Sequence, residues 1–227
     1  MTENRHKREG GQTVGKRVLI LANGDSPSAS LLARLSATHD LILATDGAAH
    51  YALEHGIEPH IVCGDFDSVH LERVQSVLPH TEFVTTPNQD RADLEKALHL
   101  ARERGAESVT ITGAAGGRVD HLLANFILLL QYHTEFSLRI VDDASEVRAI
   151  SEGAETLLNT TPGDTISLIS PSGNARVSLT GVQWVLEDYL LPTGTMGVSN
   201  VAISEQVAVK VQGGTLFLCH LPLVLTK

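Results

Sequence analysis

The sequence predicts two domains: an α/β domain with a mainly parallel sheet, followed by an all-β sandwich. Up to about residue 141, short apolar runs typical of strands alternate with segments of helical periodicity. From about Glu146 the helical periodicity disappears, and short strands separated by turn residues replace it. With 227 residues, the chain is long enough to bury a proper core. We expect a disordered tail over residues 1–16, an α/β domain over 17–143 and a β domain over 146–227.

Six strands are expected in the first half, with helical patterns between most of them. This order gives a Rossmann-like sheet, in which ligands bind beyond the carboxyl ends of the strands. Ser26 is expected to be the N-cap residue of the first helix, and Ser68 that of the third. Residues Leu122 to Leu130 are apolar nearly all round, so this last helix is expected to be buried. The expected strands are 17–22, 41–44, 61–64, 82–85, 108–112 and 137–141.

The second half reads as a series of short strands bounded by proline, glycine and asparagine. Such spacing is typical of a sandwich of two antiparallel sheets. We place the domain boundary near residues 142–146. The expected strands are 147–150, 155–158, 165–169, 176–179, 206–211 and 215–218.

Composition limits the possible partners and compartment. The net charge of −10 argues against nucleic acid, because phosphate backbones require a basic face. Cys63 and Cys219 are the only cysteines, so a disulfide framework is excluded and a reducing compartment is expected. Residues 1–16 contain no apolar core of a signal peptide, and Leu122 to Leu130 is too short to span a bilayer. We expect a cytoplasmic protein that binds no membrane.

Four turns that follow predicted strands carry aspartates. Because the turns after parallel strands share one edge of the sheet, this arrangement would concentrate negative charge there. Paired carboxylates repel each other, and a divalent cation such as Mg²⁺ stabilises both in the charged form. The aspartates concerned are Asp46, Asp65, Asp67, Asp90, Asp93 and Asp120.

Each acidic turn also has a purely structural interpretation. Asp65 and Asp67 could form an Asx-type turn with backbone amides. Asp90 and Asp93 could be the N-cap and N3 residues of the helix that follows, and Asp120 the N-cap of the last helix. His121, beside Asp120, is more often a structural or surface residue than a catalytic base.

A glycine-rich turn, Gly113 to Gly117, joins a strand to the last helix and ends at Arg118. Backbone amides at such a turn can hold anionic oxygens, and a guanidinium adds a planar fork suited to phosphate. The turn fits neither of the common nucleotide-binding motifs cleanly. A nucleotide with magnesium on its phosphates is the ligand that best fits an acidic edge beside this turn.

Five motifs in this order and spacing resemble the thiamine pyrophosphokinase family. They are residues 45–49 (TDGAA), 64–68 (GDFDS), 89–94 (QDRADL), 116–121 (GGRVDH) and 197–200 (GVSN). The resemblance implies transfer of the terminal two phosphates of ATP to the hydroxyethyl group of thiamine, giving thiamine diphosphate and AMP. It also implies a homodimer with active sites at the subunit interface.

The resemblance assigns roles to residues of the first half. Asp65, Asp67 and Asp93 would hold Mg²⁺, with Asp90 completing the acidic site, and Asp90 or Asp93 would orient or deprotonate the hydroxyl. Together with Arg118, which would stabilise the phosphates, these are the expected catalytic residues. Nucleotide contacts are expected from Asp46, Gln89, Gly116, Gly117 and Arg118.

Thiamine contacts are implied on both sides of the boundary. Asp120 would meet the aminopyrimidine, and Ser199 and Asn200 of the second half match the family's thiamine-contacting pair. Trp184 matches a position where an aromatic ring can stack on thiamine, although a lone tryptophan is also commonly packed in a core.

The chain departs from the family's pattern at two places. Ala92 stands where the family commonly has threonine, and Thr45 stands where alanine is more usual. Both changes affect the nucleotide site more than the class of reaction. Two other functions remain open from sequence: a pyrophosphokinase acting on a hydroxymethyl-pterin, and a non-catalytic sensor of thiamine or a nucleotide.

Overall fold

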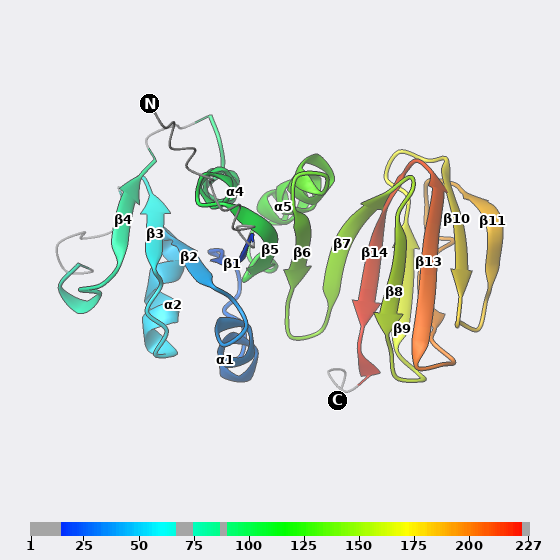
Figure 1. Ribbon diagram of the computed structural model, residues 1–227, viewed down its shortest axis with the longest axis horizontal. Helices are drawn as coiled ribbons and strands as arrows, with labels where there is room; N and C mark the ends of the chain where they lie inside the picture. The colour runs from blue at the N-terminus through cyan, green and yellow to red at the C-terminus, as the bar shows by residue number, and fades with distance from the viewer. Residues whose placement is uncertain (1–14, 67–74, 87–89, 224–227) are drawn as a thin grey trace, which may run out of the picture.

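A ten-stranded sheet runs through most of the molecule (Figure 1). The computed structural model describes residues 15–66, 75–86 and 90–223, and the statements below concern these residues. Most of the predicted tail, most of the helix expected after Ser68, and the predicted site residues Asp67 and Gln89 lie outside them.

Six neighbouring strands of this sheet are parallel, in the order β4-β3-β2-β1-β5-β6. All six were expected from the sequence, with ends that differ by two residues or fewer. The chain leaves β1 toward β2 and later returns to β5 on the other side, so the strand order reverses between β1 and β5. The strands are β1 (Lys16–Leu21), β2 (Leu41–Thr45), β3 (Ile61–Gly64), β4 (Glu82–Thr85), β5 (Ala106–Thr112) and β6 (Ser137–Val141).

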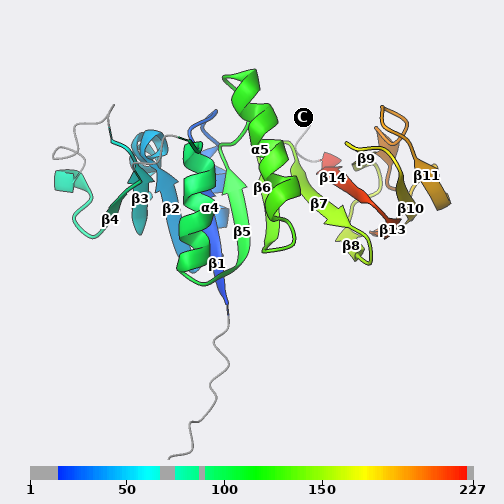
Figure 2. The same ribbon diagram turned by 90° about the horizontal axis from the view of Figure 1, so that it is seen from above.

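Helices cover both faces of the parallel strands. Leu19 and Leu21 of β1 belong to a buried cluster with α1 (Ala29–Ser36) and α2 (Ala49–Glu54), which follows the short 3-10 turn η1 (Asp46–Ala48). The alternate residues Val18 and Ile20 belong to a second cluster with α4 (Asp93–Glu103) and α5 (Val119–Tyr132), which pack on the opposite face (Figure 2). The alternation follows from the two-residue period of a strand.

Three helix starts differ from the sequence prediction. The side chain of Ser28, not Ser26, caps α1 and accepts a hydrogen bond from the Leu31 amide at 3.2 Å. Ala92 is the N-cap residue of α4 and Arg118 that of α5, and neither has a side-chain capping bond. The interpretation of Asp90 and Asp120 as N-cap residues is therefore wrong, and Asp93 is the first residue of its helix, not the third.

Helix α5 is less buried than its composition suggests. Only Leu128, Leu129 and Tyr132 are buried, near its end. Leu123 and Ile127 are 61% and 57% exposed, so the expectation of a helix buried all round is wrong. Exposed apolar side chains that follow one another along a helix are typical of a surface that contacts another molecule.

The sheet continues past the predicted domain boundary. Strand β7 (Glu146–Ser151) pairs antiparallel with β6, and β14 (Thr215–Leu221), β9 (Thr165–Ile169) and β12 (Asn200–Val201) follow in that order to the edge. At residues 142–146 the strand direction changes, but the sheet itself is not interrupted.

A separate antiparallel sheet has the order β11-β10-β13-β8. One buried cluster contains side chains of this sheet together with side chains of β7, β9 and β14, such as Val209 and Leu218. Strand β11 and the two-residue strand β12 were not expected from the sequence. The bounds are β8 (Glu155–Asn159), β10 (Ala175–Thr180), β11 (Leu186–Leu191) and β13 (Gln206–Gly213). Among the described helices, none has the length and apolar character needed to cross a membrane.

Candidate active site

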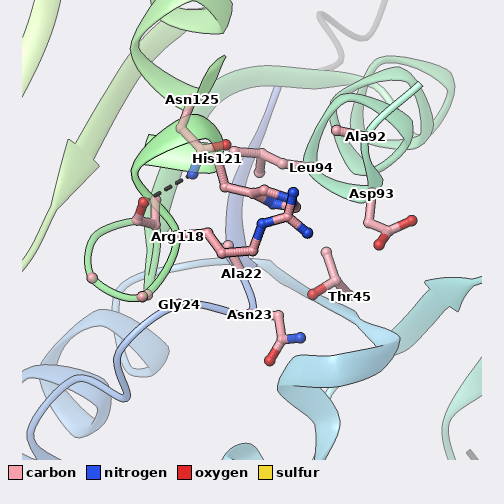
Figure 3. A pocket seen from close by; sticks show the side chains of 14 residues that line it. Ala22, Asn23, Gly24, Thr45, Ala92, Asp93, Leu94, Arg118, His121 and Asn125 are labelled. Carbon is pink, nitrogen blue, oxygen red and sulfur yellow. Dashed lines mark hydrogen bonds between the residues drawn. The ribbon is translucent and has the colours of Figure 1, made fainter. Parts of the chain in front are cut away.

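A cavity of about 360 Å³ lies beyond the carboxyl ends of β1, β2 and β5 (Figure 3). It therefore sits where the strand order reverses, which is where ligands bind in open α/β sheets. The turns after the three strands form one side of it, and the N-terminal ends of α4 and α5 form the other. Its lining residues are Ala22, Asn23, Gly24, Thr45, Ala92, Asp93, Leu94, Gly113, Ala114, Gly116, Gly117, Arg118, His121 and Asn125.

The glycine-rich turn takes a shape that side chains would oppose. Gly116 and Gly117 have φ angles of 82° and 64°, in the left-handed region that favours glycine. A Cβ atom on Gly116 would lie 2.0 Å from the carboxylate of Asp25. The amide of Asp25 donates to the Ala115 carbonyl at 2.8 Å, and the side-chain amide of Asn125 donates to the Ala114 carbonyl at 2.8 Å. These bonds fix the turn from both sides, as a phosphate-binding loop requires.

Arg118 lines the cavity from the start of α5 and pairs with Asp120. Its Nε and Nη2 atoms donate to the two carboxylate oxygens at 3.1 and 2.5 Å. This bidentate pairing lowers the pKa of Asp120 to about 2. Both side chains are exposed, so the pair is readily exchanged for another anion. The guanidinium points toward the side of the cavity where Asp93 lies (Figure 3).

Asp93 contributes the carboxylate on the opposite wall. Its Oδ1 accepts a hydrogen bond from Nζ of Lys96 at 2.9 Å, one helical turn later. The Lys96 side chain is only 7% exposed, whereas that of Asp93 is 48% exposed. A buried ammonium group thus holds a half-exposed carboxylate at the cavity.

Asp46 forms a second acidic point beside the cavity, just after Thr45. Its carboxylate accepts hydrogen bonds from the amides of Gly47 (2.7 Å) and Phe66 (3.2 Å). Burial raises its pKa, the two amides lower it, and the charges of Asp93 and Asp65 raise it further. The carboxylates of Asp65 and Asp93 are therefore close enough to act on Asp46, as expected for turns at one edge of the sheet.

Gly64 allows this close approach. A Cβ atom at Gly64 would lie 2.4 Å from the Asp46 carboxylate, so any larger residue would displace it. The glycine therefore makes room for a neighbouring carboxylate.

The described residues fit a divalent cation electrostatically but do not complete a ligand set. Among them, no three His, Cys, Asp or Glu side chains are close enough together to hold a metal ion. Asp67, the second carboxylate of its motif, lies outside the described residues, and Asp90 is exposed in the turn before α4. The charges of Asp93 and Asp65 disfavour the ionised form of Asp46, and a cation near the three carboxylates would offset this effect.

The residues implied to contact thiamine in the second half lie far from the cavity of the same chain. Asn200 begins β12, at the sheet edge, and five strand spacings separate β12 from β5. At the usual spacing this is about 24 Å. A single protomer therefore does not bring Ser199, Asn200 or Trp184 to Arg118.

The local structure distinguishes these residues. Trp184 is 56% exposed, so the alternative that it packs in a core is wrong. Asn200 is buried; its Oδ1 accepts from the Trp184 and Val201 amides, and its Nδ2 donates to the Trp184 carbonyl at 2.7 Å. These three bonds occupy most of the hydrogen-bonding positions of the Asn200 side chain and hold the backbone of Trp184 in place. Ser199 is exposed and has a φ of 65°.

Sequence reasoning did not identify three residues of this region: Asn23, Lys96 and Asn125. A signal was present for Asn125, which interrupts an apolar run. Lys96 lies between Glu95 and Ala97, and its burial in α4 could not be predicted from this pattern. Asn23 gave no signal beyond its place after a predicted strand, and Thr45 was noted only as a departure from the family's pattern. His121, considered more often structural than catalytic, is exposed and lines the cavity.

Two family models match the chain. Residues 32–141 match the catalytic domain of thiamin pyrophosphokinase, and residues 155–216 match its vitamin B1 binding domain. Together the two ranges contain most of the chain. They include Asp93 and Arg118 at the cavity, and Trp184 and Asn200 in the second half.

Individual relatives agree with the family models. A thiamine pyrophosphokinase of Bacillus subtilis is 28% identical over 197 residues, which are 84% of this chain and 92% of the relative. Thiamin pyrophosphokinase 1 of Caenorhabditis elegans is 27% identical and covers 77% of this chain and 76% of its own length. The crystal structure of the Bacillus subtilis enzyme superposes with a TM-score of 0.80 at 26% identity, over 91% of this chain and 99% of that one. The chain belongs to the thiamine pyrophosphokinase family.

Proposed function

We propose that this protein transfers the terminal two phosphates of ATP to the hydroxyethyl group of thiamine, with release of AMP. One observation supports this most directly: in a chain of this family, a cavity at the strand-order reversal brings together a glycine-rich turn, Arg118 and Asp93. In-line transfer of a diphosphate group from ATP to a hydroxyl oxygen depends mainly on positioning and on neutralising the phosphate charge, which these groups supply.

We assign the phosphates to the Gly116–Arg118 side of the cavity. Backbone amides at the start of α5 face this side, and Arg118 can exchange Asp120 for a phosphate oxygen because the pair is exposed. Asp120 is then free to accept a hydrogen bond from the aminopyrimidine of thiamine. Asp46 and Gln89 complete the proposed nucleotide contacts.

We assign Mg²⁺ to Asp65, Asp67 and Asp93, with Asp90 nearby. The charges of Asp65 and Asp93, which raise the pKa of Asp46, support this placement. When bound, the ion neutralises charge on the triphosphate. Asp93 also orients the attacking hydroxyl, or removes its proton together with Asp90.

We propose a homodimer in which the second copy supplies Ser199, Asn200 and Trp184. Three exposed apolar residues support it: Val119, Leu123 and Ile127 lie four residues apart along α5 and are 57–69% exposed. A stripe of this kind is typical of a protein interface. Exposed Trp184, Met196 and Ile203 supply a second apolar surface in the β region.

Three finer points complete the proposal. The second half forms the sandwich of two sheets expected from the sequence, supported by the buried cluster that both sheets share. The domains are 17–143 and 146–227, and the protein acts in the cytoplasm. Membership of the family disfavours both the pterin-specific enzyme and the non-catalytic sensor.

The direct test is incubation of the protein with ATP, Mg²⁺ and thiamine, followed by chromatography. The proposal predicts thiamine diphosphate and AMP, and no AMP when a hydroxymethyl-pterin replaces thiamine. Arg118→Gln should abolish most of the product, whereas Arg102→Gln, an equal charge change on the outer side of α4, should not. Thiamine binding without AMP formation would contradict the proposal and support the sensor.

A further inference from the structure

A second cavity of about 310 Å³ lies on the other face of the parallel sheet. Its residues come from four neighbouring strands, β1, β5, β6 and β7, and from the segment after α1. Arg17 lies two residues before Leu19 in β1, so both side chains are on the face that α1 covers, opposite to α4 and α5. The two cavities share no residue. We call it the arginine cavity; it is lined by Arg17, Thr38, His39, Ser108, Thr110, Ser137, Arg139 and Arg148.

Counting the ion pairs between residues that the structure describes, the arginine cavity has three guanidinium groups and two carboxylates that pair with them. Arg17 pairs with Asp40 at 2.7 Å, but Arg139 and Arg148 both pair with one carboxylate, Glu146. The side chains of Arg139 and Arg148 are only 39% and 29% exposed. Burial lowers the pKa of both groups, and the charge of Arg139 lowers that of Arg148 further. An excess guanidinium in partly buried surroundings is costly without an anion.

His39 adds no charge to the arginine cavity, and it helps to position Arg139. Its Nδ1 lies 2.6 Å from the Leu35 carbonyl, which can only accept, so Nδ1 carries the proton. Its Nε2 then accepts from the buried Thr110 hydroxyl at 2.9 Å, and that hydroxyl accepts from Nε of Arg139 at 3.1 Å. Burial and the nearby arginines lower the pKa of His39, so it is neutral at pH 7. This chain of bonds fixes the Arg139 guanidinium in place.

We propose that the arginine cavity binds a small phosphorylated anion, held by Arg139 and Arg148, with Arg17 at its rim. Guanidinium groups suit tetrahedral phosphate oxygens, and the hydroxyls of Ser108 and Ser137 can donate to the remaining ones. The volume exceeds that of one phosphate group, so a phosphate monoester fits as well as free phosphate. The site is remote from the glycine-rich turn and does not depend on the reaction assigned to it.

The test is calorimetric titration of the full-length protein with inorganic phosphate and, separately, glycerol 3-phosphate, at constant ionic strength. Arg118→Gln removes binding at the first cavity, and the remaining binding should belong to the arginine cavity. Adding Arg148→Gln should weaken that binding roughly tenfold or more. The variant should still fold, because the Arg139–Glu146 pair stays neutral, and Arg148→Gln alone should form thiamine diphosphate normally in phosphate-free buffer.

Arg102→Gln in the Arg118→Gln background is the matched control, since Arg102 is exposed on the other face of the sheet. It should leave phosphate binding unchanged. The proposal is overturned if the Arg118→Gln protein binds neither ligand, or if Arg148→Gln and Arg102→Gln bind them equally. Binding of inorganic phosphate without glycerol 3-phosphate would identify free phosphate as the ligand; binding of both would identify the phosphate monoester class.

Discussion

At the scale of single residues, the ion pair between Lys96 and Asp93 should matter more for turnover than for stability. Lys96→Met keeps an apolar stem in a buried position, and Asp93 remains half exposed to water. We expect the free energy of unfolding to change by less than about 1 kcal/mol. Turnover should fall roughly tenfold or more, because the Asp93 carboxylate loses its fixed orientation.

Arg102→Met is the control for Lys96→Met, because it removes an ion pair with Glu135 from the same helix, away from the cavity. It should leave turnover unchanged. Urea unfolding and steady-state assays of both variants check the prediction. Normal turnover of a folded Lys96→Met protein would show that Asp93 needs no orienting partner.

Asp46 gives a prediction about pH. Its pKa in the folded protein is raised above the ordinary value, mainly by burial. The stability that it contributes is therefore present below its unfolded pKa of about 4 and is lost as pH rises through the folded value. Asp46→Asn has no such loss, so it should gain stability relative to the natural protein between pH 4 and 7.

Mg²⁺ should reduce this difference at pH 7, because a cation favours the charged carboxylate. Urea unfolding of both proteins across this pH range, with EDTA or with Mg²⁺, measures the effect. A stability difference that does not vary with pH would contradict the environment described for Asp46.

At the scale of elements, a comparison of two glycines distinguishes a specific role of the glycine-rich turn from the general cost of a strained backbone. Gly116 and Gly105 have nearly equal φ angles, 82° and 81°, but a Cβ atom meets Asp25 only at Gly116. Both alanine variants should lose about 1 kcal/mol of stability from the left-handed conformation. Only Gly116→Ala should also raise the KM for ATP, and equal KM values would show that the turn does not bind phosphates.

The start of α4 offers a gain in stability. Ala92 occupies the N-cap position with φ −66° and ψ 153°, a conformation that suits a capping threonine. Ala92→Thr should raise the free energy of unfolding by about 1 kcal/mol, measured by urea unfolding. Ala92→Val has the same shape without the hydroxyl and should bring no gain. If the two variants were equally stable, the hydroxyl would not cap the helix.

The sequence was a better guide to elements than to their contacts. Parallel strands are short apolar runs that end at glycine or aspartate, so their positions could be predicted to within two residues. Strand β12 was missed because it has only two residues, and β11 because most of its side chains are exposed or half-buried and show no apolar alternation. Ser28 was missed as a cap because Ser26 precedes a proline that also fits the first position of a helix. Burial of α5 could not be predicted, since an apolar helix can face either a core or a second chain.

Of the candidate site, the aspartates and the glycine-rich turn could be predicted because they follow strands of one sheet. The role of Lys96 depends on the rotation of α4 against the sheet, which no local pattern determines. Asn200 matched a ligand-contacting motif, but its amide is occupied by backbone groups of Trp184 and Val201.

At the scale of the whole molecule, the proposed thiamine contacts require two copies of the chain for one site, because five strand spacings, about 24 Å along the sheet, separate β12 from β5. Asp93→Asn and Trp184→Ala should each have little activity alone. Mixed after unfolding and refolding together, they should regain about a quarter of the natural activity, because half of the dimers have one intact site of two. Absence of recovery in mixed dimers, confirmed by sedimentation, would place each site within one chain.

The measurement that tests the reaction most directly uses ATP labelled in both the β and γ phosphates, with thiamine and Mg²⁺. Transfer of both terminal phosphates in one step predicts that both labels appear in thiamine diphosphate, with one AMP formed per product and no ADP. Appearance of ADP with thiamine monophosphate, carrying only the γ label, would contradict the account.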